Sequence, residues 1–169
     1  MFKRHLVLAA LAVTALMAVA CSDSPSTGRA IADVSMINGG EPVSSSVSIA
    51  ADDNIPMEFR WRPYNNTLMD TPETTPHGDI VIEHYRITWT RDSAGSGVLP
   101  SREENTSIFV PVYTLVTAGV RVVTASEKTD PSLAGPPVTM TAHIDFNARE
   151  MGTDSEIKFS TSFTVIFTN

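Results

Sequence analysis

Apolar and polar residues alternate with a period of two along much of this chain, and this alternation constrains its fold most strongly. In residues 57–62, Met57, Phe59 and Trp61 alternate with polar side chains. The segments 138–147 and 157–168 continue the pattern over longer stretches. Because successive side chains of a strand point to opposite faces, this period predicts half-buried β-strands.

The alternation also predicts which side chains face the core. In 138–147 the expected inner face is Val138, Met140, Ala142, Ile144 and Phe146; in 157–168 it is Ile157, Phe159, Thr161, Phe163, Val165 and Phe167. In 80–91 we expect Val81, Tyr85, Ile87 and Trp89 inside, with His84, Arg86 and Thr88 outside. A one-residue slip would reverse each face, so the strand register should be well defined.

The remaining chain supplies further strands and the turns between them. Shorter strands are expected at 32–37, 47–50, 106–110 and 113–125, turns at 38–40, 93–97, 135–137 and 151–154, and an exposed loop at 65–77. Seven or eight short strands with regular turns predict an all-β fold, an antiparallel β-sandwich of the immunoglobulin or fibronectin type III class. The alternative is an up-and-down barrel. With one cysteine in the chain, the disulfide of an antibody domain is excluded.

The N-terminal segment MFKRHLVLAALAVTALMAVAC begins with basic residues and ends at Cys21. Its apolar part, residues 6–19, is shorter than the about 20 residues that span a bilayer, so a signal peptide is favoured over a membrane anchor. The small residues before the thiol and the polar residues after it resemble the signal and lipobox of bacterial lipoproteins. An ordinary secretory signal cut after Ala18-Val19-Ala20 is the alternative.

The lipoprotein resemblance implies cleavage between Ala20 and Cys21 and attachment of diacylglycerol to the Cys21 thiol, with palmitate or another acyl chain on the freed amino group. It divides the chain into a signal at 1–20, a polar tether at 21–30 and the β-sandwich domain at 31–169. By the sorting rule of enteric bacteria, Ser22 favours the outer membrane, facing the periplasm or the surface, over the inner membrane.

Charge and cysteine content exclude several functions. The full chain has a formal net charge of −7, and removal of Lys3 and Arg4 with the signal makes it −9. This balance argues against nucleic-acid binding, which needs a cationic surface. Once Cys21 carries a lipid, no thiol remains for disulfides, thiolate metal sites or nucleophilic catalysis.

Three segments of the β region carry a second resemblance. IVIEHYRITWTRDSAG at 80–95, VTMTAHID at 138–145 and SFTVIF at 162–167 are similar to uncharacterised bacterial lipoproteins with one immunoglobulin-like domain after the lipobox. The resemblance covers residues 79–169. It implies a fold and a location, and it implies no activity.

The candidate metal site consists of His84, His143 and Asp145, which lie on the expected outer faces of their strands. Imidazole and carboxylate ligands suit zinc if the strands are neighbours, and Glu83 is a further candidate. The alternative is an ordinary solvated face. Asp52-Asp53-Asn54 offers oxygen ligands for calcium, together with Asp70, Glu73 or Asp79, but lacks the spacing of a calcium loop; an acidic turn is the alternative.

The sequence contains no P-loop, dinucleotide fingerprint or nucleophile elbow, so we expect neither a cofactor nor an enzyme. Arg60 and Arg62 flank Trp61 near Tyr64; we expect Trp61 in the core and the arginines in solvent. The sequence predicts a lipid-anchored envelope protein, a binding or structural module whose partners are the membrane through Cys21 and an envelope protein or glycan. The alternative is an envelope hydrolase or metal-binding module using His84, His143 and Asp145.

Overall fold

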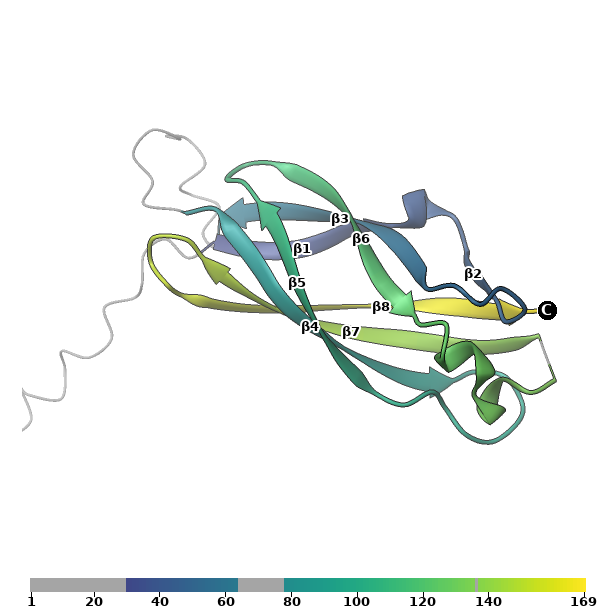
Figure 1. The fold of residues 1–169 in the computed structure, drawn as a ribbon. Coiled ribbons are helices and arrows are strands. Elements are labelled where there is room, and N and C mark those ends of the chain that lie inside the picture. The colour runs from purple at the N-terminus through teal and green to yellow at the C-terminus, as the bar shows by residue number, and fades with distance from the viewer. Residues whose placement is uncertain (1–29, 64–77, 136) are drawn as a thin grey trace, which may run out of the picture.

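The alternating segments form eight strands in the part of the chain that the structure, a computed structural model, describes: residues 30–63, 78–135 and 137–169 (Figure 1). The strands are β1 (Ala30–Ile37), β2 (Val43–Ser46), β3 (Asp53–Pro63), β4 (Ile80–Arg91), β5 (Arg102–Val110), β6 (Leu115–Val123), β7 (Val138–Glu150) and β8 (Glu156–Thr168). The helical segments described are single 3-10 turns, η1 (Asn38–Gly40), η3 (Glu127–Thr129) and η4 (Pro131–Leu133). The all-β prediction is confirmed.

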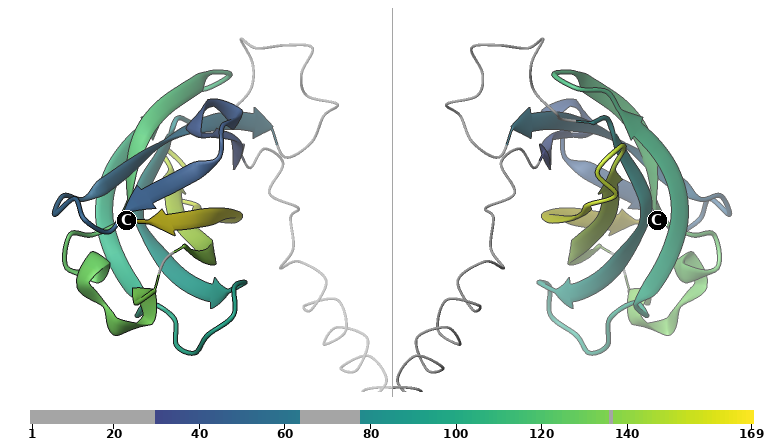
Figure 2. Two further views of the ribbon diagram at one scale, coloured as in Figure 1. Left: turned by 90° about the vertical axis from the view of Figure 1, so that its right-hand side faces the viewer. Right: turned by 90° about the vertical axis from the view of Figure 1, so that its left-hand side faces the viewer.

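The strands form a three-stranded sheet in the order β1-β3-β6 and a five-stranded sheet in the order β2-β8-β7-β4-β5. The larger sheet curls around the core like half of a barrel (Figure 2). All neighbours are antiparallel except β2 and β8. The chain changes sheets between β1 and β2, where Asn38, Gly39 and Gly40 have φ angles of 51°, 64° and 85°. Glycine adopts this left-handed backbone at little cost, so the predicted turn is confirmed.

The inner faces of the two sheets form one aromatic core. Phe59 of β3 meets Phe146 of β7 edge-on, with ring centroids 5.4 Å apart, and Phe146 stacks on Phe159 of β8 at 5.0 Å. Trp89 packs on Phe167 with centroids 5.9 Å apart. Each such buried side chain contributes on the order of 1.5–3 kcal/mol. The inner faces predicted for 57–62, 138–147 and 157–168 are confirmed.

Two sequence predictions about strands are wrong. Val81 was expected inside, but Ile80 and Ile82 are buried there instead, because a β-bulge at Glu83 shifts the phase of β4 by one residue. The strand expected at 47–50 lies earlier in the chain, at β2, and residues 47–50 form a turn. The loop expected at 65–77 lies outside the described residues.

The register places the strand ends together at two ends of the fold. At the Ala30 end, β1, β4, β6 and β8 begin and β3, β5 and β7 end. At the Thr168 end, β2, β6 and β8 end, β3 and β7 begin, and η3 and η4 lie in the connection from β6 to β7 (Figure 1).

Candidate functional site

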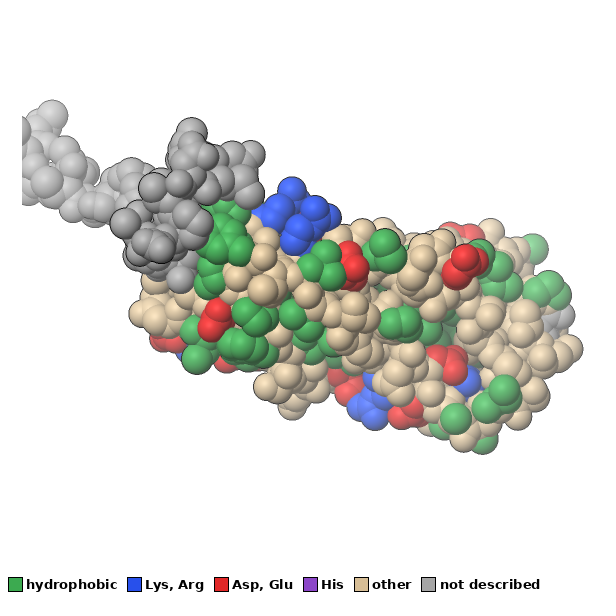
Figure 3. Space-filling model, turned by 90° about the horizontal axis from the view of Figure 1, so that it is seen from above, with side chains coloured by type: hydrophobic (Ala, Val, Ile, Leu, Met, Phe, Trp, Pro, Cys, Tyr) green, Lys and Arg blue, Asp and Glu red, His purple; other side chains and the backbone are tan. Residues whose placement is uncertain are grey.

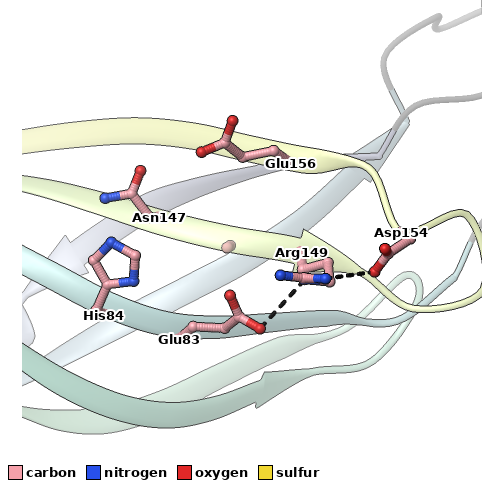
Figure 4. A pocket seen from close by; sticks show the side chains of 7 residues that line it. Glu83, His84, Asn147, Arg149, Asp154 and Glu156 are labelled. Carbon is pink, nitrogen blue, oxygen red and sulfur yellow. Dashed lines mark hydrogen bonds and ion pairs between the residues drawn. The ribbon is translucent and has the colours of Figure 1, made fainter.

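A polar hollow lies on the outer face of the five-stranded sheet, toward the Ala30 end (Figure 4). Its volume is about 240 Å³, and it is lined by Glu83, His84, Asn147, Ala148, Arg149, Asp154 and Glu156. These residues come from β4, from β7, from the turn after β7 and from the start of β8. Strand pairing therefore brings together polar groups that are up to 73 positions apart in the sequence.

The β-bulge in β4 is the reason that Glu83 and His84 both face this hollow. Ile82 pairs with Ala148, and His84 pairs with Asn147, so Glu83 is the extra residue between two consecutive positions of β7. A bulge of this kind turns adjacent side chains to the same face. The sequence pattern predicted His84 on the outer face, but it could not predict that Glu83 would join it.

An arginine held between two carboxylates forms one wall of the hollow. The Arg149 guanidinium donates to Asp154 at 2.7 Å and lies 3.3 Å from a Glu83 oxygen. The pKa of Arg149 is raised, first by the hydrogen bond to Asp154 and then by the charges of both carboxylates. In Figure 4, His84 and Asn147 lie beside each other at the other end of the hollow. The site thus combines a permanent cation with an imidazole and an amide.

The dimensions of the hollow suit a contact between surfaces. Small-molecule pockets usually have volumes of about 300–1,000 Å³ and bury most of the ligand. Here the side chains of Glu83 and Arg149 remain 45% and 47% exposed, so water reaches the charged wall. The hollow can donate to and accept from polar groups of a protein or glycan pressed against the sheet.

The structure does not bring His84, His143 and Asp145 into one site. His84 lies opposite Asn147, and His143 is four residues away along β7, or about 13 Å at the rise of a strand. The His143 Nε2 atom is 3.0 Å from Thr90 Oγ1, and Asp145 pairs with Arg86. Zinc ligands must lie about 2 Å from one ion. Within the described ranges, no three His, Cys, Asp or Glu residues have metal-binding spacing.

The acidic turn at Asp52 and Asp53 is bonded to protein donors. Asp52 accepts from the Ala125 N–H at 2.8 Å and from Arg121 at 3.3 Å. The first of these bonds is the main cause of the lowered pKa of Asp52. Asp53 accepts from Lys128 Nζ at 2.8 Å. These contacts support the interpretation as a structural turn. Of the other calcium candidates, Asp79 accepts from the Val112 N–H, and Asp70 and Glu73 lie outside the described residues.

An ion-pair network continues from this turn into the Thr168 end. Arg102 donates to Glu104 at 3.1 Å and to Glu127 at 2.9 Å, and also to the main-chain carbonyls of Arg121 and Val122. Arg121 in turn pairs with Glu104 and Asp52, which raise its pKa. The sequence analysis missed this network. A signal was present, because charged residues occupy the inward phase at the start of β5.

The predicted lipidation and cleavage residues, Cys21 and Ala20, lie outside the described residues. Among the residues described, no helix is long and apolar enough to cross a membrane.

No protein-family model, curated protein or solved structure matches this chain.

Proposed function

We propose that this chain is a lipid-anchored protein of the bacterial cell envelope whose two-sheet fold is a non-enzymatic binding or structural module. The observation that carries the proposal is Cys21. It is the single thiol of the chain, it follows Ala18-Val19-Ala20 directly, and it ends a basic-then-apolar segment too short to span a bilayer.

The anchor and the fold are close in the sequence. Residues 22–29 separate Cys21 from the start of β1 at Ala30. These nine Cα–Cα steps span at most about 32 Å even when fully extended. A lipid on Cys21 would therefore hold the two-sheet fold near the membrane surface. Ser22 favours the outer membrane as that surface.

The strand order supports an immunoglobulin-like sandwich as the finer fold. With β1, β3 and β6 as strands A, B and E, the order β8-β7-β4-β5 corresponds to strands G-F-C-C′. Trp89, on the strand in the position of C, is buried as the tryptophan of that strand is in immunoglobulin domains. An up-and-down barrel is disfavoured, because β3 pairs with β6 and β4 with β7 rather than with sequence neighbours.

The outer face of the five-stranded sheet is the proposed contact surface. The hollow beside His84 and Arg149 presents donors and acceptors of both charges to solvent. Polar, wet contacts of this kind are common in protein recognition. We propose an envelope protein or glycan as the partner of this face.

Metabolic labelling with an alkyne-bearing palmitate tests the anchor. The wild-type chain should carry the label and fractionate with the outer membrane, and Cys21→Ala should lose both properties. Ser22→Ala is the matched control, since it changes the next residue and keeps the thiol, so its label should be retained. Equal labelling of wild type and Cys21→Ala would overturn the proposal.

Photo-crosslinking in living cells tests the contact surface. A photoreactive residue at Asn147, inside the hollow, should give a discrete crosslinked product. The same residue at Thr117, an exposed position of β6 on the outer face of the three-stranded sheet, is the control and should not give that product. Identical products from both positions, or no product from Asn147, would contradict a specific contact at this face.

A further inference from the structure

Large apolar side chains are exposed around the Ala30 end. Of the nine exposed large apolar side chains in the described part of the chain, five lie at this end: Ile31, Phe109, Tyr113, Leu115 and Met151. Phe109 and Leu115 are each 49% exposed and Met151 is 51% exposed. The other four lie toward the Thr168 end, so exposure alone does not distinguish the two ends: Met36, Ile49, Val98 and Ile166. What distinguishes the Ala30 end is the set of residues beside its exposed apolar side chains.

Strand register sets these apolar side chains beside arginines on the outer face of the three-stranded sheet. Ile31 of β1 pairs with Arg62 of β3, and Arg60 pairs with Leu115 of β6. Figure 3 shows apolar and basic side chains side by side on this face, toward the Ala30 end. Asp33 pairs with both arginines, and the side chains of Arg60 and Arg62 remain 46% and 54% exposed. Apolar residues beside arginines match the boundary between head groups and acyl chains, where the arginine stem is buried and its charge stays hydrated.

Tyr113, in the connection between β5 and β6, is held outward by its turn. Its φ angle is 57°, a left-handed backbone that costs free energy for a residue with a side chain. The turn is maintained by the Thr114 N–H, which donates to Pro111 at 3.2 Å, and by the Trp61 N–H, which donates to Thr114 at 3.1 Å. The Tyr113 ring also packs edge-on against Trp61, with centroids 4.5 Å apart. Strained backbone at an exposed aromatic residue is a feature of binding sites, and tyrosine is enriched at membrane interfaces.

The position of Cys21 identifies the occupant of this end. The limit of about 32 Å on residues 22–29 applies to Ala30, so the apolar end, where β1 begins, stays within that distance of a lipid on Cys21. Because the lipid already holds the protein at the membrane, a second contact between the fold and the same membrane is intramolecular. Such a contact can be well populated even when its own affinity is weak. The net acidic charge of the chain disfavours broad electrostatic contact with an anionic bilayer, so the contact must be apolar.

We propose that the Ala30 end lies against the bilayer that holds Cys21, with Phe109, Tyr113, Leu115 and Met151 at the head-group level. This inference rests on the proposed lipid anchor. It sets the fold with the Thr168 end pointing away from the membrane. The outer face of the five-stranded sheet then stands at the side, open to a partner.

Single-cysteine labelling tests the orientation, because a lipidated Cys21 leaves no other thiol to react. Leu115→Cys and the control Ile49→Cys, 59% exposed on the turn before β3 near the Thr168 end, each receive a fluorophore in the full lipidated protein. The proteins are reconstituted into phosphatidylcholine vesicles containing a head-group quencher. Emission from position 115 should fall several-fold, and emission from position 49 should be unchanged. Met151→Cys repeats the test at the same end if Leu115→Cys does not fold.

The outcomes separate the orientation from the anchor. Equal quenching at both ends, or none at position 115, in protein that floats with the vesicles would overturn the orientation and leave the anchor standing. If the fluorophore at position 115 is not quenched, the occupant of the apolar end would instead be a protein partner or a second copy of the chain. An unmodified Cys21 by mass spectrometry, with no flotation, would overturn the anchor itself.

Discussion

At the Thr168 end charged side chains close the two-sheet fold, whereas at the Ala30 end main-chain groups and one buried carboxylate do so. At the first end, Arg102 joins Glu104 and Glu127, and Lys128 is buried against Asp53. At the second, the Trp61 indole donates to the Gly78 carbonyl at 3.1 Å, and the Gly78 N–H donates to Glu150 at 3.0 Å. The Thr168 end is thus closed by ion pairs and the Ala30 end by hydrogen bonds to the main chain, while both ends expose large apolar side chains.

This difference teaches that the same two-sheet fold can be closed at its two ends by different interactions. Buried charges are costly to leave unpaired, so the Thr168 end has one well-defined arrangement. The Ala30 end is closed by hydrogen bonds between Gly78 and the side chains of Trp61 and Glu150. Substitutions at the two ends should therefore differ in their effect on stability.

The largest effect is expected at Gly78, whose main chain bonds to the side chains of Trp61 and Glu150 at the Ala30 end. A Cβ atom on Gly78 would lie 1.6 Å from the Met151 carbonyl oxygen, a backbone atom that cannot move aside alone. Gly78→Ala should lower the free energy of unfolding by more than about 4 kcal/mol, as measured by urea denaturation. Gly119→Ala is the control: its Cβ would meet Asn54 at 3.7 Å, and its effect should be below about 1 kcal/mol in either direction. Equal losses of unfolding free energy in the two variants would show that the close packing of Gly78 does not support the Ala30 end.

A smaller loss is expected when the ionic end is opened. Arg102→Met removes the cation paired with the buried Glu127 carboxylate, which keeps only its Thr124 donors. It also removes the guanidinium that donates to the Arg121 and Val122 carbonyls. We expect a loss of about 3 kcal/mol in the free energy of unfolding. Arg86→Met is the control, because its partner Glu103 lies 3.7 Å away in solvent, and such pairs contribute less than about 1 kcal/mol. A neutral Arg102→Met would show that the network does not hold the end closed.

Acid should weaken the Thr168 end through Asp52. Its pKa is lowered in the folded state from the ordinary 3.8, so the folded chain binds fewer protons than the unfolded chain near that pH. The stabilisation is therefore present above pH 3.8 and is lost as the pH falls through the lower folded value. Asp52→Asn should flatten this part of the profile of unfolding free energy against pH. Thr164→Ala, which removes no titratable group, should keep the wild-type profile; identical profiles for Asp52→Asn and wild type would contradict the assignment.

The smallest effect on stability is expected from the exposed apolar residues of the Ala30 end. Leu115→Ser and Met151→Ser should each change the free energy of unfolding by no more than about 0.5 kcal/mol, since neither side chain is part of the core. Phe59→Ala, fully buried in the same fold, should cost about 3–5 kcal/mol. A large loss from either serine variant would mean that these residues support the fold rather than a contact.

The sequence predicted much of the fold and little of the candidate site. The inner positions Met57, Phe59 and Trp61 follow from a local period of two, which depends on the geometry of one strand alone. His84 was correctly placed on an outer face, but its expected partners were not its neighbours. The match between His84 and Asn147 depends on the relative register of β4 and β7, which no pattern within either strand contains.

By itself, the sequence determined the all-β class, the phase of three long strands and the position of the single thiol, because these are properties of consecutive residues. Only the tertiary structure decided that Ile82 rather than Val81 enters the core, that Arg102 meets Glu127 across 25 positions, and that Leu115 and Ile31 share one end. Bulges, registers and ion pairs between strands depend on packing against distant segments. The energy of a residue in one strand therefore depends on contacts with residues that are distant in the sequence.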